Sequence, residues 1–392
     1  MSMYALVLDG EQKSALSAAR ELASAGVTVL VGSAYGSAPA RYSRAASGSF
    51  TYTRPQSDRA AFVADLAKQA ASLKEKPIIL TFSDATHLTV YEYREELAKT
   101  CQLFLSSPEA VETLFDKKKT YDLARTLHIP AIPDWTADTG FPCVVKPRVS
   151  VSWHSLKGVN RTATIVFNEA EKSAVETEID ATTGLPAIVQ KLVVGKEYGV
   201  EFLCKDGVVL LQFAHERVRS LSPRGGAATV KQVLADIVIL KEVTRYAAAL
   251  AVATVWNGPM MVEFKQDTQT KKMYLMEVNG RFWGSLPLAL RAGVPFVERY
   301  AECATGQLLK KKATPTRRTV QRTQHWLGDA RWLLSVLFTH DPLRPTLYPS
   351  RWSALRMFLF DTFFTLKDVW SWRDPLPGLM EIVHTIVKKI LV

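Results

Sequence analysis

The sequence predicts an α/β domain with a doubly wound parallel sheet, then an α+β unit, then a helical C-terminal region. Three observations predict this order. Short apolar runs alternate with helix-forming segments over residues 4–99. Strand-like segments joined by turns dominate residues 115–305. Beyond residue 305, prolines break the helical patterns into short pieces, and the composition becomes basic and rich in tryptophan.

The first domain is predicted from its alternating patterns. Each expected strand is a short apolar run, which is typical of strands buried in a parallel sheet. No Gly-x-Gly-x-x-Gly follows the first of them, which argues against dinucleotide binding. The strands are expected at residues 4–8, 27–31 and 77–80, and the helices at 14–25, 58–73 and 91–99.

The second unit is predicted to contain antiparallel sheets. The turn Lys205-Asp-Gly207 lies between two apolar segments, which is a strong hairpin signal. A second strand pair, 260–264 and 272–278, is separated by a polar turn. The other expected elements are helices at 116–127 and 238–253 and strands at 143–146, 164–167, 188–192, 198–204 and 208–213.

Composition and charge exclude several classes of protein. With 392 residues, 47% of them apolar, the chain can bury a large core, and it lacks an uncharged apolar run of about eighteen residues that could cross a membrane. The N-terminus does not resemble a secretory signal, so we expect a cytoplasmic protein. The four cysteines are scattered, without the spacing of a metal site or disulfide framework.

The net charge of +11 is concentrated in the C-terminal region. Residues 305–392 contain 14 Lys and Arg against 6 Asp and Glu, a net charge of +8, which leaves +3 for the first 304 residues. Because the body has no basic stripe and no recognisable nucleic-acid module, we expect no nucleic-acid partner.

Two carboxylates and an amide are predicted to face one another on the second strand pair. Glu277 and Asn279 have the i, i+2 spacing that directs side chains to one face, and Glu263 lies on the partner strand. Such hard oxygen ligands suit Mg²⁺. Arg281 continues the alternation and adds a cation able to bind two oxygens at once. Acids on a hairpin are also commonly solvated or salt-bridged, so this pattern alone leaves both interpretations open.

Two lysines and a glutamate are candidates for nucleotide contacts. Lys146 ends an apolar strand, where a buried cation needs an anionic partner such as phosphate, or else reaches solvent. Lys117 lies in a run of three lysines that could equally be a solvated helix face. Glu197 precedes a strand and could accept hydrogen bonds from ribose hydroxyls or simply lie on the surface.

In their order and spacing, these segments resemble the ATP-grasp superfamily. The most specific is Glu277-Val-Asn-Gly-Arg281, which resembles the Glu-x-Asn-x-Arg signature of the branch containing biotin carboxylase and the carbamoyl-phosphate synthetase large chain. The resemblance implies ATP and Mg²⁺ as cofactors, with Mn²⁺ as an alternative. It assigns the metal to Glu263, Glu277 and Asn279, and the phosphates to Lys117 and Lys146. Gln190, Lys191 and Leu192 would form the hinge that reads adenine, and Glu197 would hold the ribose.

The resemblance also implies a division of the chain. It places a Rossmann-like pre-ATP-grasp domain at residues 1–112, the lid and small lobe at 113–205, the large lobe with the metal site at 206–305, and an added helical region at 306–392. One segment departs from the family. After Lys146 the family has a glycine-rich loop over the phosphates, whereas here Gly158 is the only glycine among residues 148–158.

The reaction implied is ATP-dependent ligation of a small-molecule carboxylate to an amine through an acyl phosphate. Arg281, Lys146 and Arg219 are the expected catalytic residues. Substrate contacts are expected from His215, Arg217, Arg219 and Arg224, with Arg217 and Arg219 on one strand face, although a salt-bridged surface strand fits them equally well. A catalytically degenerate ATP-grasp scaffold or regulatory partner is the alternative. The sequence leaves both substrates unidentified and a homodimer open.

The C-terminal region is predicted to contain amphipathic helices. One apolar face is expected to contain Leu355, Phe358, Leu359, Thr362, Phe363, Leu366 and Trp370. Such basic, tryptophan-rich helices could lie peripherally on the anionic inner face of a membrane. They could equally dock on the body of the protein or on another subunit, which is the commoner arrangement.

Overall fold

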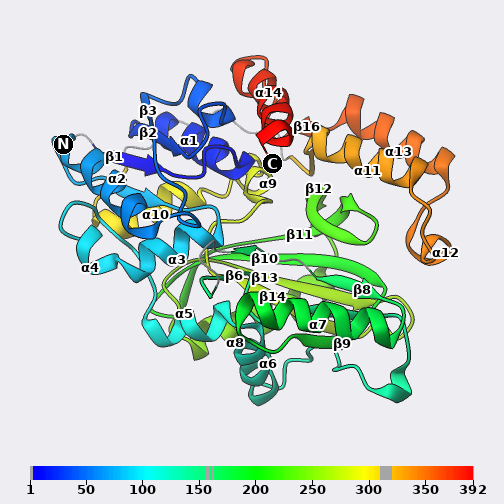
Figure 1. Ribbon diagram of the computed structural model, residues 1–392. Helices are drawn as coiled ribbons and strands as arrows, with labels where there is room; N and C mark the ends of the chain where they lie inside the picture. Colours follow the sequence, from blue (N-terminus) through cyan, green and yellow to red (C-terminus); the bar gives the residue numbers. More distant parts are fainter. Residues whose placement is uncertain (1–2, 155–158, 161–162, 310–319, 392) are drawn as a thin grey trace.

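The computed structural model describes residues 3–154, 159–160, 163–309 and 320–391 (Figure 1). Its strands form a four-stranded sheet, a three-stranded sheet, a seven-stranded sheet and a two-stranded hairpin. No helix among the described residues is long and apolar enough to span a membrane.

The N-terminal sheet is parallel throughout, as the sequence predicted. Its strand order is β3-β2-β1-β4, and every neighbouring pair is parallel. Ala5, Leu6 and Val7 of β1 are fully buried because helices and loops cover both faces of the sheet. The elements are β1 (Tyr4–Val7), α1 (Lys13–Ser24), β2 (Thr28–Ser33), η1 (Pro39–Tyr42), β3 (Gly48–Thr51), α2 (Arg59–Ala71), β4 (Ile78–Leu80), α3 (Asp84–Glu92) and α4 (Arg94–Leu97).

A small antiparallel sheet follows, with strand order β8-β5-β9. Cys143 and Val145 of β5 face inward onto α7, while Lys146 ends the strand. The charged helix expected at 116–127 is present as α6, preceded by a separate helix, α5. The elements are α5 (Pro108–Phe115), α6 (Lys117–Thr126), η2 (Ala137–Thr139), β5 (Cys143–Lys146), β6 (Val151–Ser152), β7 (Val159–Asn160), β8 (Thr164–Val166), α7 (Glu169–Thr183) and β9 (Ile188–Lys191).

The large sheet has the strand order β14-β13-β10-β11-β12-β15-β16 and is antiparallel except for its last pair. Both predicted hairpins are confirmed. Asp206 and Gly207, at the β10–β11 turn, have φ values of 51° and 76°, the left-handed conformation that a tight hairpin turn requires. The elements are β10 (Gly195–Lys205), β11 (Val208–Ser222), β12 (Gly225–Val233), α8 (Ile237–Ala253), β13 (Gly258–Asp267), β14 (Met273–Asn279), α9 (Leu286–Arg291) and α10 (Phe296–Thr305).

The two faces of this sheet differ in character because side chains alternate along each strand. Tyr198, Val200 and Phe202 of β10 belong to an apolar core that also includes residues of α5, α6 and α8. Glu197 and Glu201 lie on the opposite face. The large sheet crosses two of the boundaries predicted between segments of the chain. Its strand β10 lies in the segment 113–205, its strands β11 to β14 in 206–305, and its strands β15 and β16 in 306–392.

The C-terminal region docks on the body of the protein. β15 (Arg322–Gln324) extends the large sheet beyond β12, and β16 (Leu366–Lys367) pairs with β15. The helices are α11 (Trp326–Phe338), α12 (Arg344–Leu347), α13 (Arg351–Phe364) and α14 (Leu376–Leu391). The apolar face expected for this region needs correction, because Leu366 lies in β16 and Trp370 follows it, both outside α13. On α13 itself, Ala354 and Asp361 are fully buried, whereas Phe363 is 75% exposed.

Candidate active site

The metal-ligand candidates lie on neighbouring strands, as predicted. Glu263 of β13 lies directly opposite Glu277 of β14, and Asn279 lies on the same face, opposite Met261. Glu263 is 9% exposed. Burial raises the pKa of Glu263, and the neighbouring carboxylates of Glu277 and Glu197 raise it further, while Arg217 opposes them. Carboxylates that are mutually repulsive and poorly solvated favour a bound cation.

These side chains match the ligand chemistry of Mg²⁺. Two carboxylates and an amide oxygen supply hard ligands, and phosphate oxygens and water would complete an octahedron. In the part of the chain that the structure describes, no group of three His, Cys, Asp or Glu side chains forms a metal site by itself. The donor set therefore fits a cation that arrives with a phosphate ligand.

Arg281 joins this site to the N-terminal domain. Its Nε donates to Asp84 Oδ1 at 2.7 Å, and its Nη2 donates to Asn279 Oδ1 at 3.2 Å. Asp84 is the first residue of α3. Although burial raises the pKa of Asp84, Arg281 holds it below its ordinary value. The arginine is thus fixed beside the candidate metal ligands by a carboxylate from another domain.

Lys146 is buried at the end of β5 and points to Tyr121 of α6. Its Nζ donates to the Tyr121 hydroxyl at 2.5 Å, and that hydroxyl donates to the carbonyl oxygen of Met276 at 2.5 Å. Burial lowers the pKa of Lys146 to about 8, although Glu277 raises it. A buried ammonium with a neutral hydroxyl as its hydrogen-bond acceptor is suited to gain an anionic ligand.

Lys117, the first residue of α6, lies close to Glu277. Its Nζ is 3.6 Å from Glu277 Oε2 and donates to Ser150 Oγ at 3.0 Å. Ser150 precedes β6, in the segment that replaces the glycine-rich loop. Asp116 caps α6 and pairs with Arg148 at 2.5 Å, which ties this segment to the helix. Ser155 and Gly158 of the same segment lie outside the described residues.

Glu197 lies between two cations on the large sheet. Its carboxylate is 2.8 Å from Arg217 Nη1 and 3.0 Å from Lys265 Nζ. Burial raises its pKa, but Arg217 and Lys265 together hold the pKa of Glu197 below the ordinary value. Arg217 also donates from Nη2 to Glu263 at 2.8 Å. Arg217 therefore lies against the candidate metal site and not in a separate acceptor pocket.

The hinge candidates lie where β9 leads into β10. Gln190 is buried, and its Nε2 donates to the carbonyl of Ile132 at 3.0 Å. The Lys191 backbone N–H donates to the Pro133 carbonyl at 3.0 Å. The segment containing Leu192 thus connects the small sheet to the large one.

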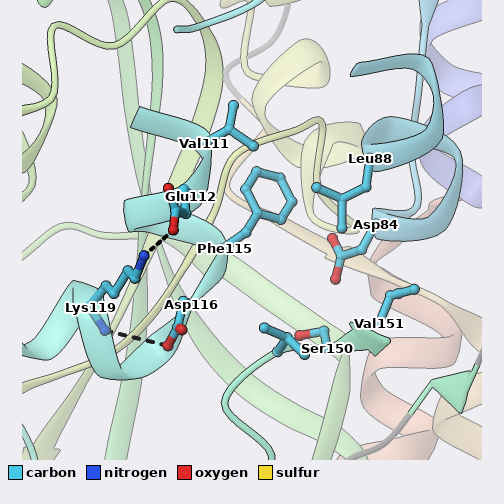
Figure 2. A pocket seen from close by; sticks show the side chains of 10 residues that line it. Asp84, Leu88, Val111, Glu112, Phe115, Asp116, Lys119, Ser150 and Val151 are labelled. Atoms are coloured by element: carbon cyan, nitrogen blue, oxygen red, sulfur yellow. Dashed lines mark hydrogen bonds and ion pairs between the residues drawn. The ribbon is translucent and has the colours of Figure 1, made fainter. Parts of the chain in front are cut away.

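A cavity of about 220 Å³ lies beside these groups. Figure 2 shows Asp84 and Leu88 of α3, Phe115 at the end of α5, and Ser150 around it. Asp84 links the cavity to Arg281 and Ser150 links it to Lys117. The cavity thus adjoins the cations of the candidate site from the side of the N-terminal domain.

The expected acceptor residues do not form one pocket. His215 is buried against Gly199, with Nδ1 3.0 Å from Glu201 Oε1. The substrate role expected for Arg219 needs correction. Its guanidinium donates to Asp329 at 2.7 and 2.8 Å and to Asp361 at 2.6 Å. The strand register is irregular on either side of this residue. Arg219 therefore binds two carboxylates of the C-terminal region, whereas Arg217 binds Glu197 and Glu263.

The substrate role expected for Arg224 needs correction for the same reason. Its Nε and Nη2 bind the two Asp341 oxygens at 2.6 and 2.9 Å, on the exposed side of the C-terminal region. Its carboxylate partner is therefore part of the chain itself.

Three residues in this cluster were not identified from the sequence. Lys265 is two residues beyond Glu263 on the same strand, so the alternation that selected Glu263 could have found it. Tyr121 is one helical turn beyond Lys117, so helical spacing could have found it. Asp84 had no such signal, since it is 197 residues from Arg281.

Comparisons with known proteins agree with this architecture. A family model described as "ATP-grasp in the biosynthetic pathway with Ter operon" matches residues 185–327. The carbamoyl phosphate synthase large chain of Caldanaerobacter subterraneus is 22% identical over 255 residues, which are 61% of this chain and 23% of that relative. The chain therefore spans about a quarter of the length of this curated relative.

Solved structures show the same fold. Biotin carboxylase from Campylobacter jejuni, in a complex titled β-γ-ATP, superposes with a TM-score of 0.61 at 18% identity, covering 79% of this chain and 72% of that one. The L-amino acid ligase from Bacillus licheniformis gives 0.58 at 17% identity, covering 82% and 78%. The fold is thus that of the ATP-grasp proteins. The ATP-grasp resemblance found in the sequence is thus confirmed, and the match to the carbamoyl phosphate synthase large chain is a similarity at 22% identity.

Proposed function

We propose that the protein is an ATP- and Mg²⁺-dependent carboxylate–amine ligase that acts on a small-molecule carboxylate through an acyl phosphate. The observation that carries the proposal is the arrangement around Glu277. This carboxylate faces Glu263 across the strand pair, lies 3.6 Å from Lys117, and raises the pKa of Lys146. Acidic metal ligands and two lysines thus surround one space, as phosphoryl transfer requires.

The residues have separate roles in this proposal. Glu263, Glu277 and Asn279 hold Mg²⁺, which would neutralise the phosphates. Lys117 and Lys146 bind phosphate oxygens, and Tyr121 positions Lys146 through its 2.5 Å hydrogen bond.

Arg281 stabilises charge on the phosphoryl group as it passes to the substrate carboxylate, and Asp84 orients the arginine.

The reaction has two balanced steps. A carboxylate oxygen attacks the γ-phosphorus, the bond to the β-phosphate oxygen breaks, and ADP and an acyl phosphate form. An amine then attacks the acyl carbon, loses a proton, and expels phosphate to leave an amide. The first step makes the carboxyl carbon electrophilic, because phosphate is a far better leaving group than oxide.

The relatives support this class of reaction without defining the substrates. The similar proteins include an L-amino acid ligase, a biotin carboxylase and a carbamoyl phosphate synthase, so the similarity does not single out one substrate. Because Arg219 and Arg224 bind carboxylates of the chain itself, the acceptor is expected near Arg281 and the cavity beside Asp84.

The test is ADP release with ATP and Mg²⁺ against pooled carboxylates and amines, with Lys146→Ala as the blank. Release that requires both pools and disappears in the variant supports the ligase. ATP binding without release from any pool would instead indicate the alternative, a nucleotide-binding scaffold.

A further inference from the structure

The C-terminal region has an unusual distribution of apolar and charged side chains. Helix α13 buries Asp361 completely and exposes large apolar residues: Trp352 is 82%, Phe363 75% and Phe364 77% exposed. Monomeric soluble proteins rarely expose contiguous apolar patches of this kind unless they bind something. The outer face of α13 consists of Trp352, Arg356, Leu359, Phe360, Phe363 and Phe364, and α11 adds exposed Arg331, Leu334 and Phe338.

Every described acidic residue of the C-terminal region is engaged in an ion pair. Some of the pairs reach the body of the protein and others stay within the region, and none of the six carboxylates belongs to an exposed residue. The pairs are Asp329–Arg219, Asp341–Arg224, Asp361–Arg219, Asp368–Lys231, Asp374–Arg20 and Glu381–His325.

Among the residues of this region whose exposure the structure describes, the exposed Lys, Arg, Asp and Glu side chains are all arginines. Arg331, Arg351, Arg356 and Arg373 are exposed, and none of them forms an ion pair with a described residue. The outer surface therefore combines apolar side chains with cations and has no exposed acidic residue between residues 320 and 387. Its charge is complementary to an anionic partner, and its apolar side chains need a partner that can take them out of water.

A groove on α13 is lined by both apolar side chains and an arginine. It has a volume of about 490 Å³ and is lined by Trp352, Ser353, Leu355, Arg356 and Leu359. In Figure 1, α11, α12 and α13 lie at the periphery of the molecule, beyond β12 of the large sheet. This peripheral position agrees with the exposure of the side chains on the outer face of α13.

We propose that the outer face of α11 and α13 binds an anionic lipid surface. Tryptophan and phenylalanine side chains enter the boundary between headgroups and acyl chains, and the arginines bind anionic headgroups. A second copy of the chain fits this face poorly, because arginines would meet arginines with no exposed acid to pair with them. A nucleic acid also fits this face poorly. Bases stack on aromatic rings, whereas this face exposes the aliphatic side chains of Leu334 and Leu359 beside its four exposed phenylalanines.

The proposal is tested by sedimentation of the full chain with vesicles. Binding to phosphatidylcholine vesicles containing phosphatidylglycerol, weakened by salt, is expected, with far weaker binding to phosphatidylcholine alone. The fluorescence of exposed Trp352 should shift to shorter wavelength on binding. Equal binding to both vesicles, or binding to neither, would overturn the proposal.

One variant tests the contribution of the apolar side chains to vesicle binding, a second tests that of the arginines, and a third is the control. Phe363→Ser with Phe364→Ser should weaken binding roughly tenfold or more, and Arg331→Gln with Arg356→Gln by about thirtyfold on anionic vesicles only. Val252→Ser, at an exposed apolar residue of α8, should bind like the unmodified protein. Because these side chains are exposed, the variants should fold normally and still bind ATP.

Two other partners give distinct results. A stable dimer that dissociates in the phenylalanine variant would show that a second copy covers this face. Salt-sensitive DNA binding lost in the same variant would show a nucleic-acid surface. Either result would replace the lipid proposal and leave the proposed ligase activity untouched.

Discussion

Glu263 and Glu277 lie directly opposite each other on antiparallel strands, and each has a cation beside it. Arg217 Nη2 is 2.8 Å from Glu263, and Lys117 Nζ is 3.6 Å from Glu277. Two carboxylates at this spacing repel each other in a buried site, so the cations offset a repulsion that Mg²⁺ would remove. The charge of each proposed metal ligand is thus offset by a cation of the chain itself.

Glu277→Gln should abolish turnover and preserve the fold. The substitution removes the charge of a proposed metal ligand without changing its volume, so ADP release should fall by at least about a hundredfold. Glu95→Gln, at an exposed helix position, is the matched control and should keep full activity. Wild-type activity in Glu277→Gln would rule out this metal site.

ATP affinity should fall as the pH rises through about 8. Burial lowers the pKa of Lys146 to about 8, so its ammonium is fully present below that pH and is lost above it. Affinity should therefore be constant between pH 6.5 and 7.5 and then decrease by up to about tenfold per pH unit. Calorimetric titration of ATP across this range measures it.

Lys146→Arg provides the control for that titration. Arginine stays charged throughout the range, so the variant should lose the decrease above pH 8 even if its affinity is lower overall. If the decrease persisted in Lys146→Arg, another group would be responsible for it.

The lowered pKa of Lys146 also makes the stability of the protein depend on pH. The folded pKa of Lys146 lies below its unfolded value of 10.5, so the unfolded chain holds more protons between about pH 8 and 10.5. The contribution of Lys146 to the free energy of unfolding should therefore rise with pH in this window. Urea unfolding of the protein and of Lys146→Met, compared at pH 7 and 9.5, would show whether the difference between them changes in this direction.

Tyr121→Phe should weaken ATP binding without unfolding the protein. The change removes the hydroxyl that accepts from Lys146 and donates to the Met276 carbonyl. Losing a hydrogen bond to a charged group corresponds to a decrease in affinity of about tenfold or more. Tyr42→Phe, which removes a surface hydroxyl bonded to Gly36, should leave affinity unchanged. Equal affinity in the two variants would show that Tyr121 does not position Lys146.

Arg219→Leu should destabilise the protein and spare ATP binding. The substitution leaves the buried carboxylates of Asp329 and Asp361 without this partner, a loss of about 3–5 kcal/mol in the free energy of unfolding. Urea unfolding gives the loss, and calorimetry of the folded fraction gives ATP affinity. A variant with normal stability and a raised KM for the carboxylate would restore the substrate role that these contacts argue against.

Alternation along strands predicted much of the fold and the placement of the candidate metal ligands. The i, i+2 spacing of Glu277 and Asn279, with Glu263 on the partner strand, was enough to place three side chains on one face, and the structure has them there. Short apolar runs likewise predicted β1, β2 and β4 as parallel strands. These features depend on local periodicity, which the sequence displays directly.

Other features depend on contacts between distant segments. Arg219 was expected to contact substrate, but its guanidinium binds Asp329, which is 110 residues away. Periodicity also identified the apolar stripe of α13 but not its direction. The usual rule turns such a stripe inward, whereas here the ion pairs of Asp361 turn the other side of the helix inward.

The central claim is that a carboxylate is phosphorylated by ATP before the amine attacks. The most direct measurement uses the carboxylate that supports ADP release, labelled with oxygen-18 in its carboxyl group, and follows the label by mass spectrometry. The acyl phosphate predicts that one labelled oxygen appears in the released phosphate for each ADP formed, and that Lys146→Ala releases none. Unlabelled phosphate, or ADP formed without any carboxylate, would contradict the account.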